Sequence, residues 1–162
     1  WQIVLLRRGP DTLPDSAFLL ALAGVLYGLA SLTIVMLIYG GERAFALVFA
    51  DLIITAAWVA IVLALFRASP RFRQTLCAVF GAGFLLQIFS VPFTLGPGIE
   101  ELQGWAAMLR LIGLLAILFW SVAVYGHIVA RAISRSPGVG VLFAVLYFVL
   151  NIELAAWLAP VS

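Results

Sequence analysis

Five long apolar runs, joined by short polar connections, constrain this chain more than any other feature of its sequence. They cover residues 17–39, 44–66, 74–95, 105–131 and 138–160. Each run provides the roughly 20 residues that an α-helix needs to cross the hydrocarbon core of a bilayer. The chain is 65% hydrophobic and only 10% charged, whereas about 25% of the residues in a soluble domain are charged. The predicted fold is therefore all-α, a single polytopic membrane domain of five transmembrane helices over residues 17–160.

Residues 1–16 precede the first run and are predicted to form an interfacial segment and a connector. The apolar start, Trp1 to Leu6, is too short to span a bilayer and is followed by Arg7 and Arg8. A tryptophan with flanking arginines is typical of a segment in the headgroup region. The segment does not resemble a secretory signal, because arginines and prolines interrupt it before any long apolar stretch.

The distribution of arginine predicts how the bundle is oriented. If the runs alternate in direction, one side of the membrane receives most of the basic residues: Arg7, Arg8, Arg67, Arg71, Arg73, Arg131 and Arg135. The other side receives Arg43 next to Glu42 and the acidic pair Glu100 and Glu101. Because cytoplasmic loops carry an excess of Lys and Arg, we expect the N-terminus inside and the C-terminus outside. The short loops and the compact chain favour a bacterial inner membrane.

Four polar side chains within the runs are predicted to lie at one depth: Asp51, Gln87, Arg110 and Glu153. At 1.5 Å per residue, each lies roughly 8–12 Å below the outer boundary. Charges inside membranes usually pair, so Arg110 is expected to pair with Asp51 or Glu153. A structural ion pair that fixes helix packing is the favoured interpretation, and an ion or proton site with a titrating carboxylate is the alternative. Asn151 points to the opposite side of its helix from Glu153 and is left out of this cluster.

Three further features of the sequence are interpreted as structural, with a functional alternative where one exists. Gly24 and Gly28 stand at GxxxG spacing and predict a helix-packing face, within the chain rather than between two copies. His127, the single histidine, lies near the inner end of the fourth run and is interpreted as an interfacial polar residue, with pH sensing as the alternative. One histidine and one cysteine, Cys77, provide no set of metal or haem ligands, so no metal or cofactor is predicted.

Signatures of enzymes are absent from the sequence, including phosphate-binding loops, GxSxG and HExxH. The net charge of +2 is small and lies in the loops, which argues against nucleic-acid binding. We predict a non-enzymatic membrane protein that acts as a scaffold or binds lipids, a membrane partner or a second copy. The alternative is a small proton- or ion-coupled carrier or channel. A carrier predicts a water-reachable cavity ending at Asp51 or Glu153, whereas a scaffold predicts that these carboxylates are sealed between packed helices.

One stretch near the end of the chain supports a family resemblance. Residues 125–140 read YGHIVARAISRSPGVG, which is similar to the turn where Yip1-type membrane proteins enter their last helix. Five short-looped spans with an arginine-bearing turn before the last one also resemble that family. The resemblance implies a membrane-embedded scaffold or partner-binding protein, and it brings no catalytic residues.

Overall fold

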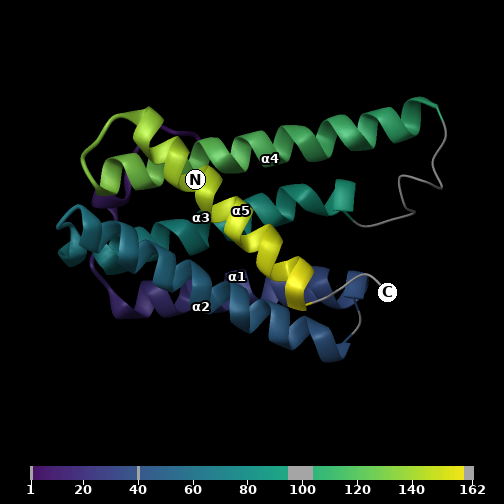
Figure 1. The fold of residues 1–162 in the computed structure, drawn as a ribbon, viewed down its shortest axis with the longest axis horizontal. Coiled ribbons are helices and arrows are strands. Elements are labelled where there is room, and N and C mark those ends of the chain that lie inside the picture. Colours follow the sequence, from purple (N-terminus) through teal and green to yellow (C-terminus); the bar gives the residue numbers. More distant parts are fainter. Residues whose placement is uncertain (1, 40, 95–103, 159–162) are drawn as a thin grey trace.

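The computed structural model describes residues 2–39, 41–94 and 104–158, and most of them belong to five α-helices (Figure 1). The helices are α1 (Ala17–Tyr39), α2 (Gly41–Leu65), α3 (Phe72–Thr94), α4 (Trp105–Ala132) and α5 (Pro137–Leu158). Two short 3-10 helices precede α1 and α3, namely η1 (Pro10–Thr12) and η2 (Ser69–Arg71). No strand occurs in these described ranges, so the all-α prediction with five helices is confirmed. The predicted acidic turn at Glu100 and Glu101 lies outside the described residues.

The helix starts follow local chemistry. α1 begins at Ala17, as the end of the polar connector predicted, whereas α2 begins at Gly41, a few residues before the predicted start at residue 44. Pro137 is the first residue of α5, a position where proline fixes a helical φ and its missing N–H costs nothing. Pro92 lies inside α3, close to its end.

Four of the described helices are long and apolar enough to cross a membrane: Ala17–Ile38, Arg43–Leu65, Ser69–Thr94 and Trp105–Ala132. In α5 the described apolar stretch, Pro137–Glu153, is shorter. Large apolar side chains also cover the outside of the bundle, among them Phe18, Phe49, Phe119 and Leu142. A soluble monomer rarely exposes apolar area so extensively, so this surface suits lipid better than water.

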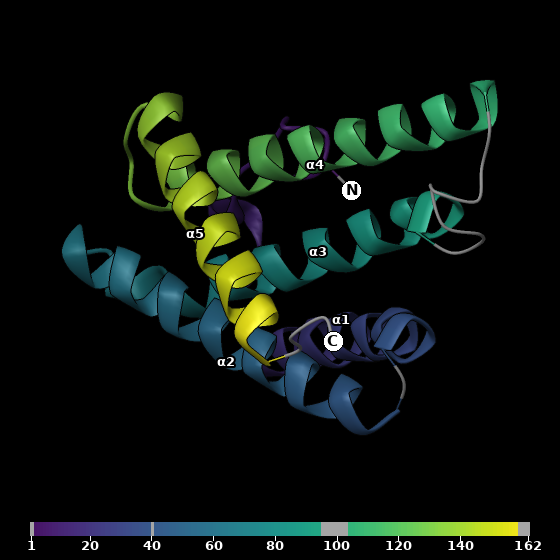
Figure 2. The same ribbon diagram turned by 45° about the vertical axis from the view of Figure 1, so that its right-hand side comes forward.

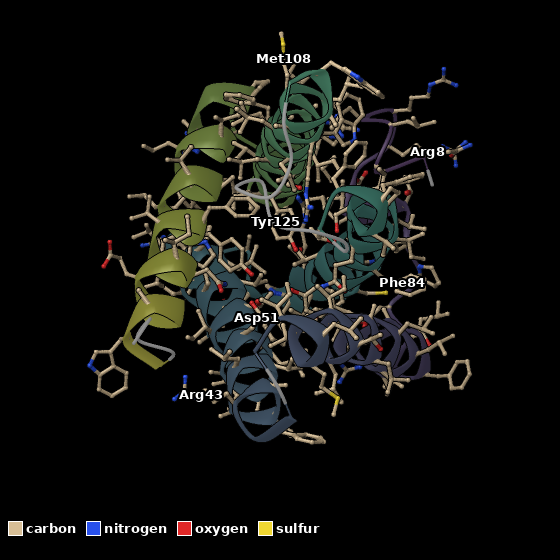
Figure 3. The ribbon with its side chains drawn as sticks, turned by 90° about the vertical axis from the view of Figure 1, so that its right-hand side faces the viewer. Arg8, Arg43, Asp51, Phe84, Met108 and Tyr125 are labelled. Atoms are coloured by element: carbon tan, nitrogen blue, oxygen red, sulfur yellow. The ribbon has the colours of Figure 1, made fainter. Side chains whose placement is uncertain are left out.

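The helices surround a common centre. α3 packs against α1 and α4, α1 also packs against α2, and α5 packs along α4 and crosses to contact α2 (Figures 1 and 2). Viewed along the bundle, the five helices form a ring, with Asp51 of α2 and Tyr125 of α4 toward its middle (Figure 3). The centre of the bundle is therefore bordered by all five helices.

α4 and α5 approach each other closely at two glycines. A Cβ atom on Gly140 would fall on the carbonyl oxygen of Gly126, and a Cβ atom on Gly126 would lie 2.9 Å from Cα of Val141. Such contacts require residues without side chains. The guanidinium of Arg71 stabilises the turn that follows α4, because its Nη1 donates to the carbonyl oxygen of Ala132 at 2.9 Å.

The N-terminal segment is packed onto the protein. Val4 is 4% exposed and belongs to the apolar core. Gln74 Nε2 donates to the carbonyl oxygen of Leu13 at 2.8 Å, and His127 Nε2 donates to that of Arg8 at 3.1 Å. The segment thus lies against α3 and α4, and the role of His127 here is to hold it. The location of the N-terminal segment and of His127 at a membrane interface stays a prediction.

Candidate functional site

The carboxylate of Asp51 accepts hydrogen bonds from two other helices. The hydroxyl of Tyr27, on α1, donates to Oδ2 at 2.6 Å. The amide of Asn151, on α5, donates to Oδ1 at 3.0 Å, and the hydroxyl of Tyr147, also on α5, lies 3.4 Å from the same oxygen. Asp51 therefore joins α1, α2 and α5 through a single side chain.

Helical spacing explains why these groups meet. Asp51 and Thr55 are four residues apart on α2, and Tyr147 and Asn151 are four residues apart on α5. Residues at this spacing lie on one helix face, one above the other. The two faces meet pair to pair, because Asn151 contacts Asp51 while the hydroxyls of Thr55 and Tyr147 share a hydrogen bond of 2.7 Å.

Aromatic rings surround the carboxylate. Tyr125 stacks on Tyr147 with ring centroids 5.4 Å apart, and Phe148 contacts both rings at 5.3 and 5.4 Å. A Cβ atom on Gly83 would lie 2.6 Å from Tyr27 and 2.9 Å from the hydroxyl of Tyr125. The glycine in α3 therefore makes room for tyrosines from α1 and α4.

Two adjoining cavities open onto these groups. The larger has a volume of about 290 Å³ and is lined by Asp51, Tyr147 and Asn151 together with rings and Ile152. The smaller, of about 170 Å³, is lined in part by Gln87, Ser90 and Ser121. They share the same three wall residues: Tyr27, Tyr125 and Phe148. The structure thus has a cavity at Asp51, whereas the carrier hypothesis predicted a cavity there that water can reach, and that access stays a prediction.

Arg110 is not part of this site. The sequence predicted that it pairs with Asp51 or Glu153, and in the structure it has other partners. Its Nε donates to the carbonyl oxygen of Phe93 at 2.8 Å and its Nη2 to that of Thr94 at 3.1 Å. Within the described residues, the single ion pair is the exposed one between Arg73 and Asp15. Arg110 instead caps the C-terminus of α3, where unpaired carbonyl oxygens attract a cation.

The other two members of the predicted cluster separate as well. Glu153 is exposed and does not line the cavity at Asp51. Gln87 lines the smaller cavity, and its Nε2 donates to Ser31 Oγ at 2.6 Å. Its buried Oε1 has no hydrogen-bond partner among the described residues. Gln87 and Asp51 thus line adjoining cavities. Residue counting predicted a similar position along the helices, but it could not predict the direction in which each side chain points.

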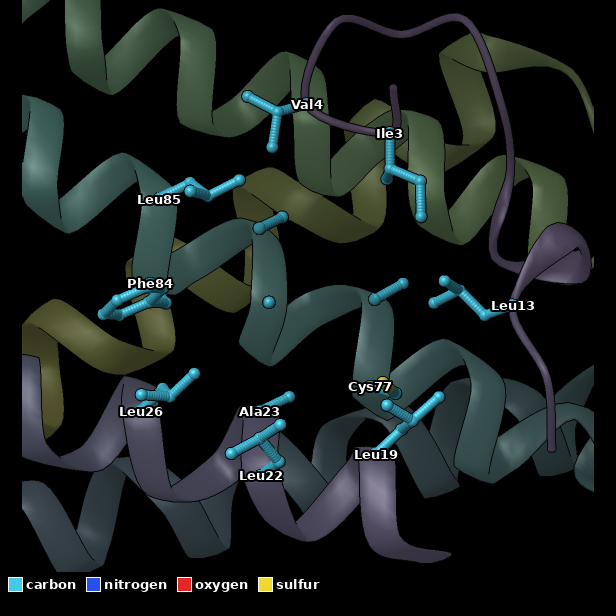
Figure 4. A pocket seen from close by; sticks show the side chains of 13 residues that line it. Ile3, Val4, Leu13, Leu19, Leu22, Ala23, Leu26, Cys77, Phe84 and Leu85 are labelled. Atoms are coloured by element: carbon cyan, nitrogen blue, oxygen red, sulfur yellow. The ribbon is translucent and has the colours of Figure 1, made fainter. Parts of the chain in front are cut away.

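Two apolar hollows lie elsewhere on the bundle. One, of about 340 Å³, lies between the N-terminal segment, α1 and α3, with Ile3, Leu22 and Phe84 in its walls (Figure 4). The other, of about 680 Å³, lies between α1 and α2 and includes Gly24 and Gly28. A Cβ atom on either glycine would meet only ordinary van der Waals neighbours, 3.5 and 3.6 Å away.

The sequence reasoning missed most of the residues around Asp51: Tyr27, Tyr125, Tyr147 and Asn151. The matching four-residue spacings on the second and fifth runs were the available signal. No group of three or more His, Cys, Asp or Glu side chains that could hold a metal occurs in the described part of the chain. No family model, curated protein or solved structure matches this chain. The resemblance to Yip1-type proteins therefore stays a prediction, and the site is interpreted from its geometry.

Proposed function

We propose that this chain is an integral membrane protein that binds a monovalent cation, or a proton, at Asp51 and carries it across the membrane. The observation that carries the proposal is the open cavity of about 290 Å³ in which the Asp51 carboxylate lies. Between the two functions that the sequence left open, this observation favours the carrier over the scaffold. The proposal assigns no catalysis to the chain.

Charge balance supports a mobile cation. Asp51 is half-buried, and a carboxylate that loses part of its contact with water is costly unless it is paired and hydrogen-bonded. Tyr27 and Asn151 supply hydrogen bonds to Asp51 but no positive charge, and no basic side chain in the described ranges forms an ion pair with it. A proton or a cation that enters the cavity would supply the missing charge.

The placement in the membrane is part of the same proposal. Four sufficiently long apolar helices and the apolar outer surface support insertion. The proposed orientation, with the N-terminus in the cytoplasm of a bacterial cell, is supported by contacts at one end of the bundle. There Arg71 bonds to the turn after α4, and His127 bonds to the N-terminal segment. The arginine-rich connections thus share one end, as alternating helices require.

A partner- or lipid-binding role is the second candidate. The apolar groove of about 680 Å³ between α1 and α2 favours it, because Phe45, Phe49 and Leu29 leave a wide apolar surface around Gly24 and Gly28. Lipid chains would fill this groove in any membrane protein, so it carries less weight than the polar cavity.

Flux through proteoliposomes tests the carrier function. Purified protein is reconstituted around a pH-sensitive or a sodium-sensitive dye, and uptake is followed after a potassium diffusion potential is imposed, in sodium buffer and in sodium-free sucrose buffer. We expect Asp51→Asn to lower uptake by about tenfold or more, which corresponds to about 1.5–3 kcal/mol of interaction with a charged group. Glu153→Gln removes an exposed carboxylate from α5 and should leave uptake unchanged. Equal uptake by wild type and Asp51→Asn would overturn the proposal.

A further inference from the structure

Resting on the proposed function, we infer that the ligand of this site is a small organic ammonium ion. Its positive charge would lie at Asp51, and its carbon atoms would lie against Tyr125, Tyr147 and Phe148. The inference depends on two properties of the larger cavity, a carboxylate and a wall of aromatic rings.

The rings have the composition of a cation–π site. Tyr27, Tyr125, Tyr147 and Phe148 line the same cavity as Asp51. The negative face of an aromatic ring attracts cations, and alkylated ammonium groups are the ligands that aromatic cages bind in proteins. Sodium or potassium ions would use only the oxygen atoms of this wall, whereas an alkylated ammonium ion would also contact its carbon, from Phe148 and Ile152.

The hydroxyl of Tyr125 would supply a polar contact to such a ligand. Tyr125 is 7% exposed and lines both cavities. Its hydroxyl is not among the buried polar atoms that lack a hydrogen-bond partner in the described part of the chain, so it is accessible from the cavities that Tyr125 lines. A ligand that carries a hydroxyl or an N–H group beside its charge would satisfy it.

Size and charge limit the ligand further. Ligand pockets commonly have volumes of about 300–1,000 Å³, so a cavity of about 290 Å³ suits a small ion. Among the described residues, Asp51 is the one acidic residue in its lining, and it would balance one positive charge. A divalent metal is disfavoured, because no second acidic, histidine or cysteine ligand from the described residues lines this cavity.

Thermal unfolding of the purified full chain in detergent tests the inference. Tetramethylammonium and choline chlorides are compared with sodium chloride at equal ionic strength. A specific ligand at a hundred times its dissociation constant should raise the unfolding midpoint by about 5–10 °C. We expect the two ammonium salts to give a saturable rise that sodium does not give, and we expect Asp51→Asn to abolish it while Glu153→Gln retains it.

Ring variants keep the test independent of the carboxylate. Phe148→Leu should weaken ammonium binding by about two- to thirtyfold, the fold-change that corresponds to cation–π energies. Phe119→Leu, on the outer surface, should not weaken it. Tyr125→Phe should weaken choline, which carries a hydroxyl, more than tetramethylammonium.

The outcomes separate this inference from the proposed function. If sodium or a change of pH shifts the midpoint through Asp51 while ammonium salts do not, the ammonium inference is overturned and the cation carrier stands. If no cation acts through Asp51, both are overturned. An ammonium effect that Phe148→Leu leaves unchanged would contradict the aromatic part of the inference.

Discussion

The hydroxyl of Tyr27 donates a 2.6 Å hydrogen bond to Oδ2 of Asp51 and so joins α1 to α2 inside the bundle. The same carboxylate accepts from Asn151 on α5. The candidate ligand site is thus also a junction of three helices. A ligand that changes the hydrogen bonds of Asp51 would change the contacts between these helices, and in a carrier this would couple binding to movement.

The bond between Tyr27 and Asp51 should stabilise the fold. We expect Tyr27→Phe to lower the free energy of unfolding by about 0.6–2 kcal/mol, as for hydrogen bonds between helices in membranes. Reversible unfolding with increasing SDS in mixed micelles measures it. Tyr125→Phe is the matched control, since no protein hydrogen bond to the Tyr125 hydroxyl occurs among the described residues, and it should change stability little. Equal losses in both variants would contradict the assigned bond.

Arg110 should act on α3 and not on the carboxylates. Arg110→Leu leaves the carbonyl oxygens of Phe93 and Thr94 without their donor and should cost about 1–3 kcal/mol of stability. The double substitution Asp51→Asn with Glu153→Gln should not restore it, because the structure pairs Arg110 with neither residue. Rescue by that double substitution in the same SDS titration would instead show an ion pair.

The close approach of α4 and α5 should tolerate no side chain at Gly140. Gly140→Ala places a methyl group against the backbone at Gly126 and should cost about 1–3 kcal/mol, the usual range for overpacking. Gly138→Ala, on the same helix with open space around it, should be neutral. Gly24→Ala and Gly28→Ala should be tolerated nearly as well. If Gly24→Ala proved as damaging as Gly140→Ala, the GxxxG face would be the tighter interface.

Two neighbouring arginines should differ in importance. Arg71 Nη1 donates to carbonyl oxygens of Arg131 and Ala132 at 3.3 and 2.9 Å, near the end of α4. Within the described ranges, Arg73 forms only a 3.7 Å ion pair with Asp15, and both side chains are more than half exposed. Arg71→Ala should therefore cost about 1–2 kcal/mol, whereas Arg73→Ala should cost less than about 1 kcal/mol. Hydrogen exchange at residues 131–136 gives a local readout, which should speed up in the first variant alone.

The sequence predicted the helices well and their interior only in part. Uninterrupted apolar runs with polar breaks determine where helices form, so the start of α1 was predicted correctly and that of α2 within a few residues. Position along a helix also follows from residue count, but the expected common depth of Asp51, Gln87, Arg110 and Glu153 below the membrane boundary stays a prediction. The rotation of each helix about its axis does not follow from apolar content, because these helices are apolar on nearly all sides.

Arg110 and Asn151 show the consequence. Arg110 was expected to find an acidic partner, but the carbonyl oxygens at the end of α3 lie closer and also attract a guanidinium. Asn151 was set aside because it faces away from Glu153, and facing away is what brings it to Asp51. Only the packing of α2 against α5 could reveal that pair.

The central claim, an accessible and negatively charged cavity at Asp51, can be tested most directly by charge-selective thiol modification. Asn151→Cys is made in a Cys77→Ser background, which leaves one reactive thiol, and its rates of reaction with cationic and anionic methanethiosulfonates of similar size are compared. Val149→Cys serves as the control, because residue 149 lies on the exposed apolar side of α5, which the account assigns to lipid and not to water. The account predicts faster reaction at residue 151 than at residue 149, a preference there for the cationic reagent, and loss of that preference with Asp51→Asn. A thiol at residue 151 that does not react, or that reacts without regard to reagent charge, would contradict it.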